Sequence, residues 1–255
     1  MLNEIYTLMC RIISFLISKI EFQRFNCKAD VGFLIDGSGS INHEEHGGSP
    51  FNWNLIKDFI LVVAKNLNIS EDGAHMAVGV FSNEATLDIK FSDYTDYESF
   101  EQAVLQLRYP SLLTYTLKGY DLAYNQMFSE SNGMRSNVPK TLIVVTDGIC
   151  ARNCSLADDA SCRETGCKSD YCHKEYFMCP NEFARWGKMF RNRKIKTIGI
   201  GVGERTNETE IIEFVGQSNY YKKKSFNQIL TKRFQQELVL CEGKKPLNKL
   251  FNCRL

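Results

Sequence analysis

The sequence predicts an α/β fold of three layers, in which a doubly wound, mostly parallel sheet lies between two layers of helices. Short apolar runs of strand length alternate with longer segments of helical spacing between about residues 27 and 241. This alternation is typical of a parallel sheet covered by helices on both faces. The run VGFLID at 31–36 is continuously apolar up to its final Asp, as expected for a strand buried on both faces.

The first half of the chain is expected to contain a hairpin and three helices after this first strand. The hairpin turns at Asn83 and Glu84, so one edge strand should run antiparallel to its neighbour. Asp96 stands where it can cap the second of the helices. The expected elements are helix 51–67, strands 75–82 and 86–91, and helices 97–107 and 115–128.

The second half repeats the pattern of an apolar strand followed by Asp and Gly, in KTLIVVTDG at 140–148. Asn207 is a candidate N-cap for the helix expected at 207–218. The last helix should present an apolar stripe formed by Phe226, Leu230, Phe234, Leu238 and Cys241. The expected elements are the strand in 140–148, helix 181–193, strand 194–202, helix 207–218 and helix 225–241.

Cysteine is the most informative part of the composition. The chain has 10 cysteines, a density that favours an oxidising compartment and predicts a secreted or surface-displayed protein. Three Asn-x-Ser/Thr sequons, at Asn68, Asn153 and Asn207, are compatible with secretion and are candidate glycosylation sites. One cluster lacks the paired C-x-x-C arrangement of zinc modules, so disulfides are expected within it. Its members are Cys150, Cys154, Cys162, Cys167, Cys172 and Cys179.

Charge and hydropathy exclude some classes of partner and bound the domain. The formal net charge is +1, which gives no general attraction to nucleic acid or to an anionic membrane. No run approaches the roughly 20 apolar residues of a membrane-spanning helix, so no span is expected in the body of the chain. One domain is expected at 27–241, with a Cys-rich insert at 150–180 and a tail at 242–255. The segment 1–26 is expected to be either a signal peptide, or its relic, or an amphipathic helix packed on the domain.

Two Asp residues follow strands that should end at the same edge of the sheet, where α/β folds gather their ligands. Asp36, Ser38 and Ser40 alternate with two glycines at positions 37 and 39. Asp147 follows the strand expected in 140–148. Glycine tolerates the backbone angles of a tight loop, so these side chains can surround one point. Carboxylate and hydroxyl oxygens suit Mg²⁺, or Mn²⁺ in its place, better than zinc.

These residues resemble the von Willebrand factor type A domain, which occurs in integrin inserted domains, matrilins and some collagens. VGFLIDGSGSI is similar to the Asp-x-Ser-x-Ser loop of that family, and VPKTLIVVTDG to the strand that carries its second Asp. SLLTYTLKGYDLAYNQMF is similar to the loop and helix in which the family places a Thr ligand. The likeness covers about residues 27–241 and implies the Rossmann-like, three-layer fold of that family.

The resemblance also implies a site and a function. It implies a metal-ion-dependent adhesion site that holds Mg²⁺ or Mn²⁺ and captures a Glu or Asp carboxylate of an extracellular protein partner. The domain would then act as an adhesion or protein-binding module and not as an enzyme. Thr116 is an alternative to Thr114 as the Thr ligand, because only two residues separate them. The implied ligands are Asp36, Ser38, Ser40, Thr114 and Asp147.

Three other interpretations of the same residues are open. Asp36 and the Ser-Gly alternation after it could form a simple turn, since these are common turn residues. The domain could instead be a structural matrix component that assembles with itself, with Cys253 forming a disulfide between chains. A Mg²⁺-dependent hydrolase is the most distant alternative, because dehalogenase-type phosphatases need an Asp where this chain has Ser38.

Several features depart from the family pattern. The first loop is long, and His43–His46 would lie on the rim of the metal site, as a solvated loop, as a partner contact or as ligands of a second ion. The insert at 150–180 would stand beside Asp147 and is expected either to shape partner choice or to be a surface excursion. The resemblance implies a disulfide between Cys27 and Cys241, which would restrain any sliding of the last helix.

Overall fold

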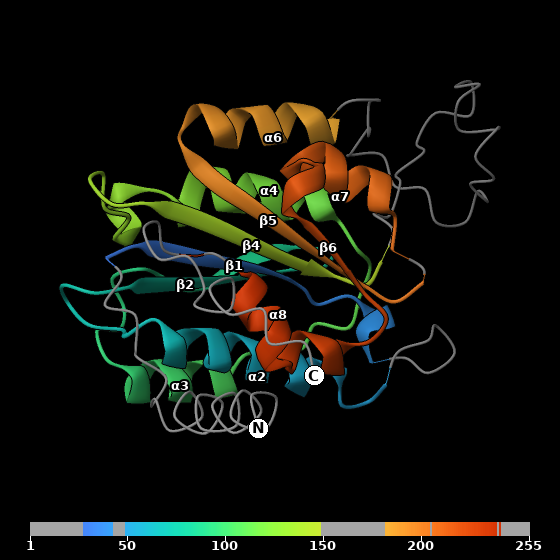
Figure 1. Cartoon of the computed structure of the whole chain (residues 1–255), viewed down its shortest axis with the longest axis horizontal. Helices are drawn as coiled ribbons and strands as arrows, with labels where there is room; N and C mark the ends of the chain where they lie inside the picture. The colour runs from blue at the N-terminus through green and yellow to red at the C-terminus, as the bar shows by residue number, and fades with distance from the viewer. Residues whose placement is uncertain (1–27, 43–48, 149–181, 205, 239, 241–255) are drawn as a thin grey trace, which may run out of the picture.

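The computed structural model describes residues 28–42, 49–148, 182–204, 206–238 and 240. Within them, six strands form one sheet in the order β3-β2-β1-β4-β5-β6 (Figure 1). All neighbouring strands are parallel except β2 and β3, so the antiparallel strand lies at one edge. The strands are β1 (Asp30–Asp36), β2 (His75–Phe81), β3 (Ala85–Ile89), β4 (Lys140–Thr146), β5 (Ile195–Val202) and β6 (Tyr220–Lys223).

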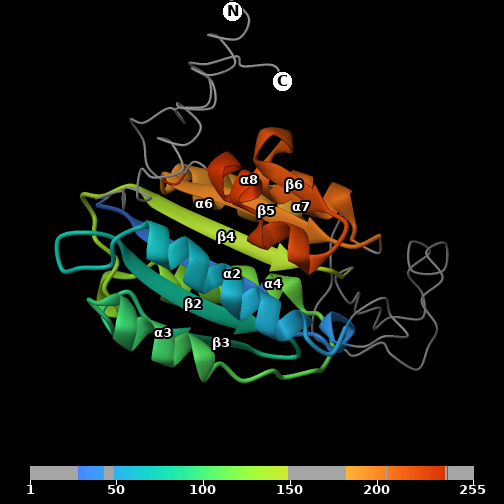
Figure 2. The same ribbon diagram turned by 60° about the horizontal axis from the view of Figure 1, so that its bottom comes forward.

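Helices cover both faces of this sheet, which confirms the predicted three-layer α/β architecture. α2, α3 and α8 lie on one face, and α4, α6 and α7 lie on the other (Figure 1). Figure 2 shows α2 lying across the first face, with α3 to one side of it. The α-helices are α2 (Asn52–Asn66), α3 (Tyr97–Leu105), α4 (Thr116–Leu122), α6 (Glu182–Asn192), α7 (Glu208–Val215) and α8 (Lys232–Glu237).

An apolar core lies on each face of the sheet. The central strand β1 contributes to both cores, and every one of its residues is buried. Side chains alternate across a strand, so Phe33 packs into one core and Leu34 into the other. On the first face, the Phe59 ring of α2 lies edge-on to Phe33, with ring centroids 6.2 Å apart. On the second face, the ring of Tyr120 stacks on the ring of Phe214, with centroids 3.9 Å apart. Burial on both faces therefore fixes β1 and the residues that follow it.

The predicted Asp96 cap and the hairpin are present in the structure, whereas the predicted side-chain cap at Asn207 is not. Asp96 accepts a hydrogen bond from the Ser99 amide at 2.8 Å, as predicted for the start of α3. β2 and β3 form the expected antiparallel pair, with a register shift between Val78 and Gly79. Asn207 occupies the N-cap position of α7, but its side chain makes no capping hydrogen bond there.

Two predicted helices differ from the structure in their regularity. The helix predicted at 115–128 begins as α4 and then widens into a π-helical turn, η3 (Ala123–Met127). The helix predicted at 225–241 is a 3-10 helix, η7 (Phe226–Leu230), followed by the short α8. Thr231 causes the break, because its side chain accepts from the Phe234 amide at 3.3 Å and so starts a new helix. The edge strand β6 was not predicted, because its sequence YYKK has no clear alternation.

Several predictions fall on residues outside the described ranges. All 10 cysteines lie there, and with them the predicted disulfides, the insert at 150–180 and the oligomer link through Cys253. Asn153 and His43–His46 lie there as well. In the part of the chain that the structure describes, no helix has the length and apolar character needed to span a membrane.

A buried ion pair fixes the start of β1 at the edge of the sheet opposite the Asp36 end. Arg135 donates from its backbone amide to Asp30 Oδ2 at 2.6 Å and from Nε to Asp30 Oδ1 at 2.8 Å. Its Nη2 also donates to the carbonyl oxygens of Ala29 and Gly73, at 2.9 and 3.0 Å. The Asp30 side chain is fully buried, whereas 17% of the Arg135 side chain is exposed. Removing one member of such a pair leaves an uncompensated buried charge.

We expect Arg135→Gln to lower the free energy of unfolding by about 3 kcal/mol, because Asp30 would lose its ion pair while it stays buried. Urea unfolding followed by circular dichroism measures this loss. Lys28→Ala is the matched control, because the Lys28–Asp72 pair is exposed on both sides and should contribute less than about 1 kcal/mol. Equal losses in the two variants would show that the Arg135 pair has no special role.

Candidate metal centre

The candidate site lies where β1 and β4 end side by side. Asp36 is the last residue of β1, and Asp147 directly follows the last residue of β4. Since the two strands are parallel neighbours in the centre of the sheet, both residues reach the same edge. Ligand sites of open α/β sheets form at this edge, beyond the carboxyl ends of the strands.

The loop after β1 fits against two neighbouring segments only because its first residue is Gly37. A Cβ atom built there would lie 2.7 Å from Cδ of Pro110 and 2.8 Å from Cγ1 of Val80. The Gly37 amide donates to the Phe81 carbonyl at 2.8 Å, and its carbonyl accepts from the Ser111 amide at 2.9 Å. Glycine is therefore required by close packing, and the chain turns from β1 into the 3-10 helix η1 (Gly39–Ile41).

A chain of hydrogen bonds connects the two Asp residues through the Ser hydroxyls. The Ser38 amide donates to Asp36 Oδ1 at 2.8 Å. The Oγ atoms of Ser38 and Ser40 are 3.0 Å apart, and Ser40 Oγ donates to Asp147 Oδ1 at 2.9 Å. The structure therefore brings together four of the predicted ligands, from two strand ends more than 100 residues apart in the chain.

Thr114 joins this cluster, whereas Thr116 does not. The position of a Cβ atom on Gly148 would be 3.6 Å from Thr114 Oγ1, 3.7 Å from Asp36 Oδ2 and 3.8 Å from Ser40 Oγ. Three side-chain oxygens, two from the end of β1 and its loop and one from the loop before α4, thus lie close to Gly148 in the loop after β4. Thr116 is instead the first residue of α4, where it is buried. The geometry therefore favours Thr114 over Thr116 as the candidate Thr ligand.

Asp36 is held in a strongly desolvated position. Its side chain is fully buried, and burial raises the pKa of this carboxyl above its ordinary value. Hydrogen bonds from Thr146 Oγ1 to Oδ2 at 2.5 Å and from the Ser38 amide act in the opposite direction and lower the pKa. A carboxylate in this environment is stabilised by a nearby cation. The donor set consists only of oxygen atoms, which is the set that hard divalent cations prefer.

Tyr109 and Trp53 hold the backbone of the loop after β1, and the sequence did not indicate this role. The Tyr109 hydroxyl donates toward the carbonyl oxygens of Ser38 and Gly39, at 2.7 and 3.1 Å. Its ring packs against Trp53, with centroids 5.2 Å apart. Tyr109 lies 71 residues from Ser38 in the chain, so no local pattern indicates this contact.

The loop that carries Thr114 is fixed by the end of β2. The Leu113 amide donates to Asn83 Oδ1 at 2.7 Å, and Ser82 Oγ donates to the Leu113 carbonyl at 2.9 Å. The Tyr115 amide donates to the Ser82 carbonyl at 3.0 Å. Thr114 therefore lies between two backbone groups that β2 holds, which positions its hydroxyl. The sequence indicated Asn83 only as a hairpin residue.

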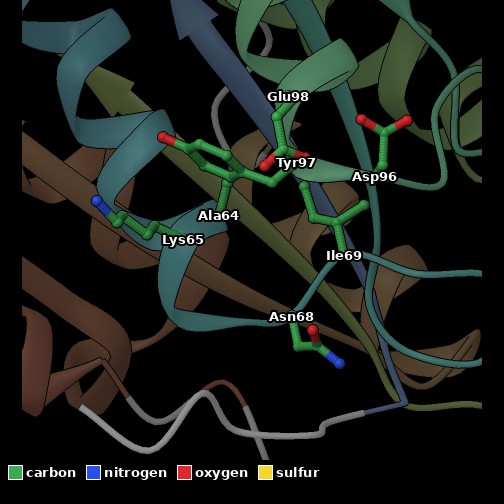
Figure 3. A pocket seen from close by; sticks show the side chains of 7 residues that line it. All are labelled: Ala64, Lys65, Asn68, Ile69, Asp96, Tyr97 and Glu98. Carbon is green, nitrogen blue, oxygen red and sulfur yellow. The ribbon is translucent and has the colours of Figure 1, made fainter. Parts of the chain in front are cut away.

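Two of the candidate glycosylation sites, Asn68 and Asn207, lie within the described residues. Asn68 follows the C-terminal end of α2 with a left-handed φ of 36°, and Asn207 precedes α7. Both side chains are half-buried. Asn68 also lines a small pocket of about 100 Å³ (Figure 3). That pocket lies at the C-terminal end of α2, whereas the cluster is bonded to the N-terminal end. Its lining residues are Ala64, Lys65, Asn68, Ile69, Asp96, Tyr97 and Glu98.

Comparisons of the sequence identify related proteins of the extracellular matrix. A family model described as von Willebrand factor type A domain matches residues 30–237. Matrilin-1 of Gallus gallus is 31% identical over 119 residues, which are 47% of this chain and 23% of that protein. Cuticlin-6 of Caenorhabditis elegans is 33% identical over 119 residues, which are 47% of this chain and 19% of that protein. The chain therefore spans less than a quarter of the length of these relatives.

These relatives also bear on where the protein resides. The collagen alpha-5(VI) chain of Homo sapiens is 30% identical over 122 residues, which are 48% of this chain and 4% of that protein. Such relatives are secreted proteins of the extracellular matrix, and this confirms the predicted extracellular location.

Solved structures share the fold. Proximal thread matrix protein 1 from the mussel byssus has a TM-score of 0.63 at 21% identity, over 82% of this chain and 44% of that chain. Another structure of that protein, with a zinc-occupied MIDAS motif, has a TM-score of 0.63 at 22% identity, over 83% of this chain and 45% of that chain. At this level of identity the likeness shows the fold alone.

We expect Asp36→Asn to raise the free energy of unfolding of the metal-free chain by about 1 kcal/mol at pH 7. The folded-state pKa of Asp36 is raised, so the folded state binds more protons than the unfolded state between the two pKa values. Stability therefore falls as the pH rises through that interval, and the neutral amide avoids the loss. Urea unfolding in EDTA at several pH values measures the difference.

The advantage of Asp36→Asn should shrink as the pH falls, because the wild-type carboxyl, whose pKa is raised by burial, then becomes protonated in the folded state. Asp58→Asn, an exposed position on α2, serves as the control and should change stability little at any pH. A lower stability of Asp36→Asn at pH 7 in EDTA would contradict the argument, since it would mean that the ionised carboxylate is well compensated without a cation.

Proposed function

We infer the function of this chain from one premise, that it belongs to the von Willebrand factor type A domain family. We propose that it is an extracellular adhesion or protein-binding module that holds a divalent cation and captures an acidic side chain of a protein partner. The observation that carries the proposal is the convergence of oxygens from Asp36, Ser40 and Thr114 beside Gly148. Binding, and not catalysis, is the activity that we assign to this site.

Five residues would hold the cation. Asp36 is buried and desolvated, Ser38 and Thr114 are also buried, and Ser40 and Asp147 are partly exposed at the sheet edge. The inner part of the cluster is therefore closed by protein, while the outer part faces solvent. A bound divalent cation supplies a positive charge with room for one further oxygen ligand. Only two of the five groups carry negative charge, so the site retains affinity for an additional carboxylate. The five are Asp36, Ser38, Ser40, Thr114 and Asp147.

The identity of the cation follows from ligand chemistry. Oxygen donors alone favour Mg²⁺ or Mn²⁺. The corresponding motif of the mussel thread protein is occupied by zinc in one structure. Zinc therefore belongs in any titration of this chain, next to Mg²⁺ and Mn²⁺. The partner is proposed as an extracellular protein that offers Glu or Asp, and a disulfide between chains through Cys253 stays a prediction.

Calorimetric titration of the oxidised chain with Mg²⁺, Mn²⁺ and Zn²⁺ tests the proposal. We expect binding by the wild type, no binding by Asp36→Ala, and tighter binding in the presence of acetate, which imitates the acidic side chain of the partner. Thr114→Val should weaken binding at least tenfold because it removes a ligand oxygen. Thr116→Val is the matched control and should bind like the wild type.

Two outcomes would contradict the proposal. The first is that correctly oxidised wild-type chain binds none of the three cations. The second is that it binds one of them equally well after Asp36→Ala, which would place the cation elsewhere. Equal effects of Thr114→Val and Thr116→Val would leave the cation site in place but contradict the assignment of its Thr ligand.

We expect Tyr109→Phe to weaken cation binding about three- to tenfold without unfolding the chain. The variant loses the single hydroxyl proton that the Ser38 and Gly39 carbonyl oxygens share. A hydrogen bond of this kind contributes about 1 kcal/mol, and the ring can still pack on Trp53. Calorimetry measures the affinity. Tyr97→Phe is the control, because it also removes one hydroxyl hydrogen bond, to Glu101, far from the cluster. Unchanged affinity in Tyr109→Phe would show that the loop keeps its shape without this residue.

A further inference from the structure

Large apolar side chains are exposed beside the candidate metal centre. Among the described residues, three large hydrophobic side chains are strongly exposed, namely Phe51 at 67%, Leu112 at 55% and Leu105 at 43%. Leu105 ends α3, but the other two belong to segments that are hydrogen-bonded to the loop after β1. Exposed apolar side chains next to a polar site commonly mark an interaction surface.

Leu112 has a fixed backbone although its side chain is exposed. Its carbonyl accepts from the Gly39 amide at 2.8 Å, and the residues on both sides of it donate from their amides, Ser111 to Gly37 and Leu113 to Asn83. An isolated parallel bridge pairs Leu112 with Ser38. The Leu112 side chain is therefore presented from a rigid position and is not the tip of a loose loop.

The residue before Leu112 is held in an unfavourable backbone conformation. Ser111 has a φ of +56°, in the left-handed region that residues with a Cβ atom seldom adopt. Strain of this kind persists where the surrounding structure imposes it, and it is concentrated at ligand sites. The hydrogen bond from the Ser111 amide to Gly37 imposes it here. The backbone is therefore strained at Ser111, and the side chain of Leu112, the next residue, is exposed to solvent.

Leu112 lies between two of the proposed ligands. It pairs with Ser38 and stands two residues before Thr114. The stretch 109–117 contains no charged residue, so a partner segment that reaches the cluster along this side meets an uncharged surface. On another side of the same loop, Phe51 stands beside Asn52, whose side chain donates to the Ile41 carbonyl at 2.9 Å. Apolar groups thus border the cluster on two segments.

We propose that Leu112 is a specificity-determining contact that receives an apolar side chain adjacent to the acidic residue of the partner. The inference rests on the proposed function, because the acidic residue must reach the cluster for its neighbour to reach Leu112. The occupant is a segment of an extracellular protein in which Glu or Asp stands next to Leu, Ile or Phe. A strongly acidic segment fits less well, since a second carboxylate would lose hydration against the apolar rim without gaining a cation.

Two immobilised synthetic peptides serve as probes. Gly-Leu-Glu-Leu-Gly and Gly-Ser-Glu-Ser-Gly, both with blocked ends, differ only in the residues next to Glu. In Mg²⁺ or Mn²⁺ we expect the oxidised chain to bind the Leu peptide about five- to tenfold more tightly, the effect of burying roughly half of one Leu side chain. EDTA and Asp36→Ala should abolish binding of both peptides.

Leu112→Ser should remove the preference for the Leu peptide and leave the affinity for the Ser peptide unchanged. Leu105→Ser is the matched control, because it removes an exposed Leu from α3, which contributes none of the proposed ligands, and it should retain the full preference. Leu112→Gln keeps the length of the side chain and should give the same result as Leu112→Ser. Equal urea midpoints for wild type and variants show that all are folded.

The outcomes separate this inference from the function on which it rests. Metal-dependent binding of both peptides with equal affinity, or a preference that survives Leu112→Ser and Leu112→Gln, overturns the role of Leu112 and leaves carboxylate capture in place. Absence of metal-dependent binding for both peptides overturns the proposed carboxylate capture, and the role of Leu112 with it. Loss of the preference in the Leu112 variants alone bears the inference out.

Discussion

The burial of Asp36 is the constraint on which the rest of this structure depends. A strand buried on both faces cannot normally end in a carboxylate without a partner, because desolvation disfavours the charged form. Here, burial raises the pKa of Asp36, and the hydroxyl of Thr146 and the amide of Ser38 partly offset that effect. The site thus uses part of the folding free energy to keep a carboxylate where a cation can stabilise it. This is the usual relation between a functional site and the stability of its scaffold.

The topology explains how so few residues can build the site. β1 and β4 are parallel neighbours, so their ends bring Asp36 and Asp147 to one edge although the chain between them forms two further strands and three α-helices. The loop that carries Thr114 is fixed by the end of β2, the other neighbour of β1. Three adjacent strand ends therefore determine the relative positions of the proposed ligands. Loops held in this way are more rigid than their lack of regular structure implies.

Local patterns in the sequence were sufficient for the architecture. The continuous apolar runs identified the central strands, because burial on both faces removes the polar alternation. Asp96 was identifiable as a cap because its interaction spans only three residues. The break in the last predicted helix was not identifiable, because the apolar stripe continues on both sides of Thr231. Thr231 acts as a cap only in the folded chain. β6 was missed because pairing with the edge of β5, and not its own sequence YYKK, determines it.

The candidate site shows the same division between local and long-range information. Asp36, Ser38 and Ser40 were recognisable because their spacing is local, and Asp147 because it repeats the pattern of a strand followed by Asp and Gly. Thr114 could not be separated from Thr116 on the sequence, because the choice depends on where α4 begins. Tyr109 was invisible, since its contacts with the carbonyl oxygens of Ser38 and Gly39 exist only in the folded chain.

Local and long-range information also supply different parts of the proposed function. The proposed ligand oxygens come from short motifs, and they specify the proposed chemistry of the site, which is capture of an acidic group. The surface around the proposed ligands comes from loops whose shape depends on contacts between distant parts of the chain. One such contact is the hydrogen bond from the Gly39 amide to the Leu112 carbonyl. A partner that presents an acidic side chain satisfies only the first part, and discrimination among such partners must arise from the second. Two chains with the same five ligands can therefore bind different partners, and the residues that distinguish them should be found on the strained loop at Ser111 and Leu112.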